Sequence, residues 1–171
     1  TSTQGGNIVM TVSGADMGKF TYNPPAGYEG PDSFTYTLTD NPNVTSLAAN
    51  RTATVSITVS GMIWFIDNNS AACTTLAAGC GRLTNPFSSL AAFQALNNGT
   101  GNNPAANDNI FVYESANPYS GPVTLLNGQK FIGQDATASL STITGITPAT
   151  GSDPLPSTNP GAPIVNITSA G

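Results

Sequence analysis

The run from residue 18 to residue 40 constrains the fold more than any other part of this sequence. Phe34, Tyr36 and Leu38 alternate with serine and threonine, which predicts a strand with one apolar face and one hydroxyl face. The same alternation begins earlier, from Phe20. Proline and glycine residues between the two runs prevent continuous pairing and force a bend; they are Pro24, Pro25, Gly27, Gly30 and Pro31.

This segment and the Thr/Val-rich strand that follows at residues 51–60 resemble the cadherin-like, immunoglobulin-type sandwich repeats of large bacterial surface proteins. Those repeats contain a segment of the form G-x-F-T-Y-x-P-x-x-G-Y-x-G-x-D-S-F-T-Y-x-x-x-D. The resemblance covers residues 1–60 and implies part of a β-sandwich. Because a whole repeat is longer on its N-terminal side, we expect the chain to enter a repeat partway through, with strands missing before Thr1.

Gly61 marks the predicted boundary between two domains, residues 1–61 and residues 62–171. Before Gly61, valine and isoleucine alternate with serine and threonine along residues 54–60, which predicts a strand with one buried face. After it, the unbroken apolar run at residues 62–66 is typical of a strand buried on both faces. The short join predicts two nearly contiguous modules.

The second domain has one good helix candidate, near residues 86–97. Leu90, Phe93 and Leu96 fall near one helical face, and Ser88 or Ser89 can cap the start. Short apolar strands are predicted around this helix, at residues 110–113, 123–126, 130–133 and 164–167.

The spacing of these strands suggests a repeating coil. Ile110 and Lys130 are 20 positions apart, which is close to one coil of a parallel β-helix. The segment at residues 134–163 is rich in serine, threonine, proline and glycine, and we expect it to form a loop between two coils.

Several pieces of the second half together resemble the start of a right-handed parallel β-helix in bacterial surface and autotransporter-like proteins. They are residues 64–69, 81–90, 107–113 and 126–134. In that family a first strand and a short helix plug the open end of the solenoid, which would otherwise expose an apolar end. The implied fold class is all-β: a partial Ig-like β-sandwich joined to the capped N-terminal end of a right-handed parallel β-helix.

Charge and composition argue against several classes of function. Only 8% of the residues are charged, the net charge is −5, and the four cations (Lys19, Arg51, Arg82 and Lys130) are scattered. We therefore expect no nucleic-acid partner. No run of about 18 apolar residues is present, so we expect no membrane insertion within this segment.

Enzymatic chemistry has little support in the sequence. Histidine is absent, which removes the Ser-His and Cys-His nucleophile systems. No two acids stand at i, i+2, and Asp32 and Asp40 flank a strand, where Asx turns are the ordinary role. We assign no catalytic residue and predict that the chain is not an enzyme.

The two cysteines, Cys73 and Cys80, are separated by six residues. With no histidine in the chain, we favour a disulfide over a zinc site, which implies an oxidising compartment. The alternative is a pair of free thiols in a loop.

Calcium is the one metal that the first resemblance brings into question, since many cadherin-like domains bind it between repeats. Residues 40–43 and 67–69 offer oxygen ligands near loops, but neither matches a dense calcium signature. We therefore assign no metal and no cofactor.

The aromatic residues allow two interpretations. Tyr113, Tyr119, Trp64 and the phenylalanines could form a platform on which sugars stack. We favour a core role instead, because Trp64 lies inside an apolar strand; the predicted end-cap core is Trp64, Phe65, Phe87, Phe93 and Phe111.

These observations predict a non-enzymatic structural segment of a secreted or surface-anchored bacterial protein, such as a stalk, an adhesin or a matrix or filament component. One alternative is a self-assembling extracellular filament subunit, completed by strands from neighbouring chains. Another is the non-catalytic N-terminal part of a β-helix polysaccharide-active enzyme. The expected partners are other segments or copies of the same surface protein, and host or matrix glycans are further candidates. The expected location is extracellular, at the bacterial cell surface.

Overall fold

The computed structural model describes residues 1–25, 27–38, 51–71, 73, 80–148, 153–161 and 167–168. The chain forms two compact units, Thr1–Ser60 and Gly61–Gly171. The chain is mostly β-structure with short helices.

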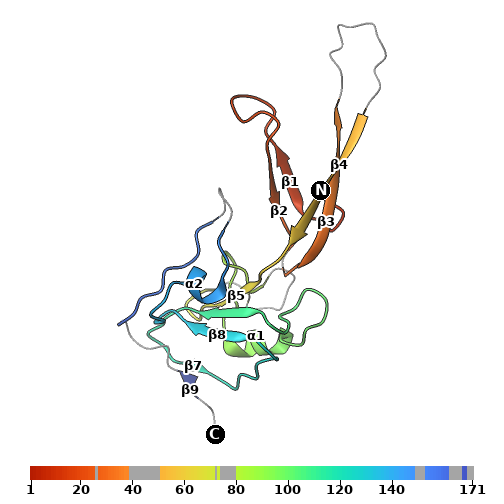
Figure 1. Cartoon of the computed structure of the whole chain (residues 1–171). Coiled ribbons are helices and arrows are strands. Elements are labelled where there is room, and N and C mark those ends of the chain that lie inside the picture. Colours follow the sequence, from red (N-terminus) through yellow and green to blue (C-terminus); the bar gives the residue numbers. More distant parts are fainter. Residues whose placement is uncertain are drawn as a thin grey trace, which may run out of the picture. The chain divides into compact units, whose positions relative to one another are not determined.

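Unit 1 contains two antiparallel strand pairs (Figure 1). β1 (Asn7–Met10) pairs with β2 (Phe20–Asn23), and β3 (Gly30–Leu38) pairs with β4 (Arg51–Val59) along its full length. β2 and β3 thus have different partners, so the predicted corner between the two runs is confirmed. The sequence analysis did not predict β1.

The alternation along β3 places its aromatic residues inside and its hydroxyl residues outside. Phe34 is buried and Tyr36 is half-buried, whereas Thr35 and Thr37 are exposed. The ring of Phe34 meets the ring of Phe20 edge to face, with centroids 4.9 Å apart. This ring pair joins the β1–β2 pair to the β3–β4 pair, and edge-to-face pairs of this kind stabilise a core beyond their buried area.

Unit 2 is organised around a three-stranded parallel sheet, in the order β5-β6-β8. The strands are β5 (Ile63–Ile66), β6 (Asn109–Val112) and β8 (Lys130–Gly133). Every residue of β5 and β6 is buried, which confirms the prediction of a first strand covered on both faces. The sheet is small, and the described residues do not form a closed or solenoid β-helix.

The two faces of this sheet pack against different layers, and in Figure 1 the two helices lie on opposite sides of it. One face packs with α1 (Leu90–Leu96) in a cluster that includes Trp64, Ile66 and Phe93. The other face packs with α2 (Leu140–Thr144) in a cluster around Phe65 and Phe111. Successive residues of a strand point to opposite faces of its sheet, so neighbouring side chains of β5 enter different clusters.

α1 is shorter than the predicted helix near residues 86–97. Ser89 is its N-cap, and the Ser89 side chain accepts a hydrogen bond from the backbone N–H of Ala92. The helix does not begin earlier because Phe87 forms a parallel bridge with Ile66, which holds the preceding backbone extended beside β5. One of the two predicted cap residues is therefore confirmed.

Residues 123–126 were predicted to be a strand, and this prediction is wrong. Side-chain amides, not a neighbouring strand, hold the backbone of this segment. Gln94 Oε1 accepts from Thr124 N at 2.7 Å, and Asn97 Nδ2 donates to Thr124 O at 2.8 Å. Gln129 Oε1 accepts from Leu126 N at 2.8 Å. The backbone groups of residues 123–126 are thus satisfied by side-chain amides in place of a neighbouring strand. The apolar pattern of the segment gives no sign of these amide partners.

Residues 134–163 were predicted to be a loop, but they contain the helix α2. Ser139 caps its start, Gly145 ends it with φ 76°, and Leu140 is buried against the sheet. A five-residue helix in a segment rich in serine and threonine has too few apolar positions to show a helical period.

A second parallel ladder joins β7 (Tyr119–Ser120) to β9 (Ile167–Thr168). The sequence analysis did not predict β7. Of the strand predicted at residues 164–167, positions 164–166 lie outside the described residues and Ile167 belongs to β9.

Candidate functional site

The outer edge of β5 is closed by the chain segment that follows it. Phe65 donates its backbone N–H to Gly81 O at 2.8 Å and accepts from Phe87 N at 2.9 Å. One step further, Asp67 N donates to Phe87 O at 2.8 Å. Residues 80–87 therefore satisfy the backbone groups that an edge strand would otherwise leave open. This segment is called the edge cap below.

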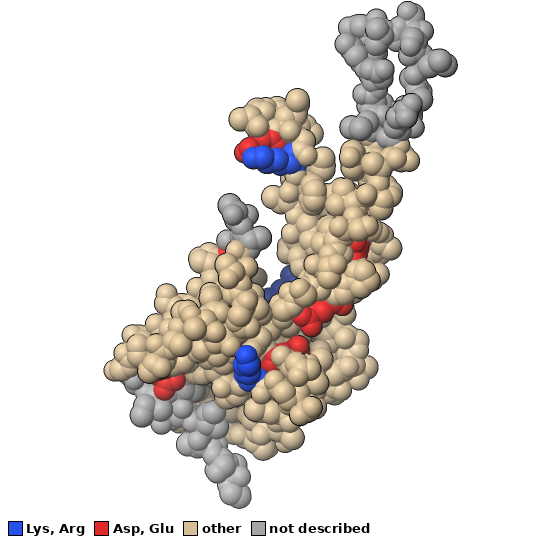
Figure 2. Space-filling model, in the orientation of Figure 1, with Lys and Arg blue, Asp and Glu red and all other residues tan. Residues whose placement is uncertain are grey.

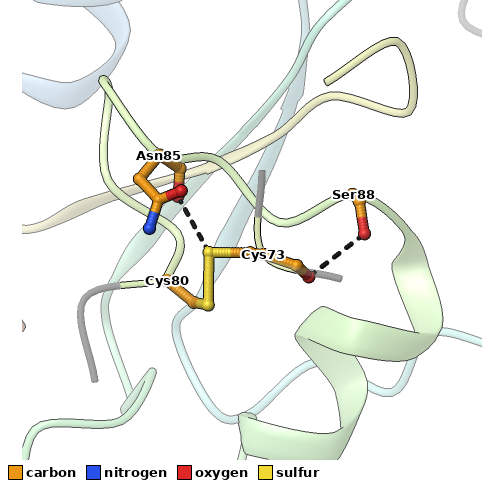
Figure 3. The surroundings of a disulfide bond; sticks show 4 residues. All are labelled: Cys73, Cys80, Asn85 and Ser88. Carbon is orange, nitrogen blue, oxygen red and sulfur yellow. Dashed lines mark hydrogen bonds between the residues drawn. A yellow bond between two sulfur atoms is a disulfide. The ribbon is translucent and has the colours of Figure 1, made fainter. Parts of the chain in front are cut away.

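A disulfide between Cys73 and Cys80 anchors the start of the edge cap (Figure 3). Both cysteines are buried, and their Cα atoms are 5.5 Å apart. Ser88 Oγ donates to Cys73 O at 3.2 Å, and Cys73 Sγ lies 3.4 Å from the carbonyl oxygen of Asn85. The predicted disulfide is thus present, and it ties the loop after β5 to the segment before α1.

Aromatic rings fill the space between the edge cap and the sheet. Phe87 stacks on Trp64 and meets Phe93 edge to face, with centroids 5.9 Å apart in both pairs. Gly81, at φ +84°, lies so close to these rings that an added Cβ would be 2.6 Å from Trp64 Cε3. The five aromatics predicted to fill one end-cap core are all buried, but they do not fill a single core. Trp64, Phe87 and Phe93 lie in the α1-side cluster, and Phe65 and Phe111 lie in the α2-side cluster.

The buried indole of Trp64 is fixed by a carboxylate. Its Nε1 donates to Asp108 Oδ2 at 2.7 Å, and Asp108 Oδ2 also accepts from Ala105 N at 2.7 Å. Asp108 is buried, so this acid has a structural role in positioning the ring.

Two tyrosines next to this core differ in exposure. Tyr119 is buried, donates its hydroxyl proton to Tyr113 O at 2.9 Å and accepts from Asn68 N at 3.2 Å. Burial raises the pKa of Tyr119 to about 12. Tyr113 is half-buried, and burial followed by the charge of Asp67 raises its pKa. Because Trp64 and Tyr119 are buried, the sugar-stacking platform of Tyr113, Tyr119 and Trp64 does not form as a set.

Asp32 is the polar centre of unit 1. Its Oδ2 accepts from Ser2 Oγ and, at 2.6 Å, from Tyr22 OH. Its Oδ1 accepts from Gln4 N at 3.0 Å and from Ser33 N at 2.7 Å. The predicted Asx turn, a local bond two residues on, is therefore wrong for Asp32: most of its donors come from distant parts of the unit.

These hydrogen bonds set the ionisation of Asp32 and of its partner Tyr22. Desolvation by burial raises the pKa of Asp32, but the hydrogen bonds from Ser2, Tyr22, Gln4 and Ser33 outweigh it and lower the pKa to about 2. Burial, and then the bond to Asp32 and its charge, raise the pKa of Tyr22 to about 12. At neutral pH the Asp32 carboxylate is therefore charged and the Tyr22 phenol is protonated, so Tyr22 can donate its hydrogen bond to Asp32.

The oxygen ligands considered for calcium are not gathered. Asp67 Oδ1 accepts from Asn69 N at 2.9 Å, which closes a local Asx turn. Residues 40–43 lie outside the described residues. Within the part of the chain that the structure describes, no three histidine, cysteine or acidic residues are grouped so that they could hold a metal ion.

An open groove of about 530 Å³ lies where the α2-side core of unit 2 reaches the surface. Leu83, Tyr113 and Leu155 form its apolar part, and these three residues pack against the Phe65–Phe111 cluster. Gln134, Asp153 and Ser157 are among its polar lining residues. No sequence pattern indicated this groove, because it is formed by segments far apart in the chain.

Charged groups are sparse over the visible surface in Figure 2, where they occur as separate spots. Lys19 and Asp16 form an exposed ion pair, and Lys130 Nζ donates to Ile143 O at 2.9 Å. Among the described residues, no helix has both the length and the apolar character that crossing a membrane requires.

Comparison with known proteins bears on unit 1. No curated protein and no solved structure matches the chain. Residues 1–60 match the family model of a bacterial Ig domain, which is typical of surface and secreted bacterial proteins. Those residues are the ones that fold into unit 1, with its two strand pairs and buried Asp32. Residues 1–60 of this chain are therefore a bacterial Ig-like domain.

Proposed function

We propose that the chain is a non-enzymatic structural segment of a secreted or surface-anchored bacterial protein, in which an Ig-like domain is followed by the capped start of a right-handed parallel β-helix. The observation that carries this proposal is the closed outer edge of β5. The Ig-like domain and the disulfide both favour an oxidising, extracellular location.

The two edges of the parallel sheet differ in a way that suits a cap. At β5 the edge cap supplies backbone partners to Phe65 and Asp67. At β8, Lys130 and Gln134 donate to β6, so the alternation of a parallel ladder directs the N–H groups of Phe131 and Gly133 away from β6. A solenoid that begins at β5 would add its next coil at β8.

The spacing of the strands also supports coils. Asn109 pairs with Lys130, an offset of 21 residues, and Tyr119 pairs with Ile167, an offset of 48. The chain passes from β6 to β7, then to β8 and β9, so that alternate strands stack in two parallel ladders. The longer second offset accommodates α2 and the proline-rich segment after it.

Amide hydrogen exchange of the chain as it stands tests the cap. We expect slow exchange at Phe65 and Asp67 and fast exchange at Phe131 and Gly133. Fast exchange at both β5 positions, or equal protection at the two edges, would overturn the proposed cap. A separate assay addresses the non-enzymatic role: turnover of an acidic polysaccharide by the purified chain would contradict it.

Self-assembly is a second candidate, supported by large apolar side chains that are exposed along the β1–β2 hairpin. These hairpin side chains are Val9, Met10, Val12, Met17 and Phe20. Met17 is 70% exposed and Val12 is 81% exposed, which is unusual for a stable soluble surface. A neighbouring chain that adds a strand to the two-stranded sheet would cover some of these hairpin side chains.

Sedimentation at several concentrations tests assembly. If the hairpin side chains mediate assembly, the sedimentation coefficient should rise with concentration, and a Val12→Ser/Met17→Ser variant should remain monomeric. A monomer at every concentration would count against this function. The β3–β4 pair carries none of the hairpin side chains, so Thr35→Ser, on an exposed position of β3, is the control.

A further inference from the structure

The groove beside Tyr113 has the composition of a binding site. Its apolar part is continuous with the Phe65–Phe111 core, and its volume of about 530 Å³ falls within the range of known ligand sites. It lies just beyond the carboxyl ends of β6 and β8, because Tyr113 follows Val112 and Gln134 follows Gly133. Ligands of open parallel sheets commonly bind at such strand ends.

One wall of the groove is stiff. It is the run Asp153–Ser157, in which Pro154 and Pro156 fix their own φ angles and restrict the residues before them to extended conformations. Gln134 holds this wall to the sheet: its Nε2 donates to Ser157 O at 3.3 Å, and Asn159 N donates to Gln134 O at 2.7 Å. A preformed wall lowers the entropy that a ligand must lose on binding.

Gln134 itself is already engaged, since its Oε1 also accepts from Glu114 N at 2.9 Å. The groups that remain for a ligand are the half-buried Tyr113 ring, the hydroxyls of Tyr113, Thr84 and Ser157, and the Asp153 carboxylate. Asp153 is exposed and forms no ion pair within the described part of the chain.

These groups select a class of ligand. An aromatic ring attracts the C–H faces of a pyranose, and a carboxylate accepts hydrogen bonds from vicinal hydroxyls. The described lining contains no lysine or arginine, and Asp153 would repel an acidic sugar. We propose that this groove binds a neutral hexose oligosaccharide, with Tyr113 as the stacking surface and Asp153 as the acceptor for sugar hydroxyls.

The openness of the site suits a polymer that lies across it rather than an enclosed small molecule. With one ring and one carboxylate, we expect a dissociation constant of about 1 mM. This inference goes beyond the structural role proposed above, and its failure would leave that role untouched, because neither the edge cap nor the strand spacing depends on the groove.

The test is a titration of the whole ¹⁵N-labelled chain with cellohexaose, maltohexaose and mannohexaose, followed by amide chemical shifts. At least one of these sugars should shift the amides of Tyr113 and Ser157 and saturate, whereas trigalacturonic acid should not. Asp153→Asn should weaken binding about threefold to tenfold, on the scale of one lost charge-assisted hydrogen bond. Glu29→Gln, an equal charge change at an exposed position of unit 1, should leave binding unchanged.

The ring is tested separately. Tyr113→Leu should abolish the saturable shifts, and Tyr113→Phe, which keeps the ring, should retain most of the affinity; the amide spectrum of each variant reports whether it folds. The proposal is overturned if none of the three neutral sugars binds, if trigalacturonic acid binds as well as they do, or if Asp153→Asn behaves like Glu29→Gln. Should Tyr113→Leu fail to fold, Asp153→Asn and Tyr113→Phe still decide the outcome.

Discussion

Replacing Gly81 by alanine should destabilise unit 2 through a clash in the edge cap. The added Cβ would collide with the Phe87 ring and lie 2.6 Å from Cε3 of Trp64, whereas carbon atoms normally approach to about 3.5–4.0 Å. Overpacking of a filled core costs about 1–3 kcal/mol. Gly81 also has φ +84°, and a left-handed backbone costs an alanine about 1–2 kcal/mol. We therefore expect Gly81→Ala to lower the free energy of unfolding by about 2–5 kcal/mol.

Gly145→Ala is the matched control, because the two glycines share a backbone conformation but not their surroundings. Gly145 has φ +76°, and among the described atoms beyond its chain neighbours none lies within 4 Å of an added Cβ. This control should lose only the backbone contribution of about 1–2 kcal/mol. The difference between the two variants, about 1–3 kcal/mol, then measures the close approach of the rings.

Urea unfolding followed by tryptophan fluorescence is the assay. Trp64 is the only tryptophan, so its signal reports unit 2. With a denaturant slope of about 2 kcal/mol per M, a difference of about 2 kcal/mol separates the two unfolding midpoints by about 1 M. If the urea midpoints of the two variants differ by less than about 0.2 M, the close packing of the Trp64 and Phe87 rings does not require a glycine at position 81. The packing described for the edge cap would then be wrong.

Four further predictions concern other interactions. The double variant Cys73→Ala/Cys80→Ala should lose about 2.5 kcal/mol, from the entropy of an eight-residue loop, and a reducing agent should then have no further effect on its midpoint; a midpoint equal to that of the oxidised chain would contradict this. Trp64→Phe leaves the buried Asp108 without its indole donor and should cost about 1–3 kcal/mol by circular dichroism, and an unchanged melting temperature would refute the role of that bond. Folding lowers the pKa of Asp32 from 3.8 to about 2, so its stabilisation is complete above about pH 4 and is lost as the pH falls towards 2; amide signals of β3 should weaken in that range, and Asp32→Asn should be less stable at neutral pH and lack this pH dependence. Folding raises the pKa of Tyr22 from 10.0 to about 12, so its contribution is complete below pH 10 and is lost as the pH rises towards 12; a Tyr22→Phe variant that loses stability over the same alkaline range would show that another group is responsible.

Local patterns predicted much of the strand structure, because burial on one or two faces leaves a direct signature in the sequence. The alternation from Ser33 to Thr37 indicated the orientation of β3, and the unbroken apolar run at residues 62–66 indicated burial of β5 on both faces. The two cysteines indicated their own pairing, since no other partner is present in the chain.

The incorrect predictions from the sequence share one cause. Residues 123–126 carry the apolar pattern of a strand, but amides from Gln94, Asn97 and Gln129 occupy their backbone groups. Asp32 has the structural role that was predicted, but the predicted local Asx turn is wrong, because three of its four donors, from Ser2, Gln4 and Tyr22, are 10 to 30 positions away. Long-range side-chain bonds leave no periodic trace in a sequence, so pattern analysis cannot detect them.

By itself the sequence determined the corner between the two runs, the change of core near Gly61, the disulfide and the low charge of the surface, because each depends on residue types close together in the chain. Only the tertiary structure decided that residues 80–87 close the edge of β5, that Asp32 gathers its donors, and that Tyr113, Gln134 and Asp153 line one groove. These features join positions tens of residues apart. Their free energy comes from burial and hydrogen-bond geometry that exist only once the layers have packed.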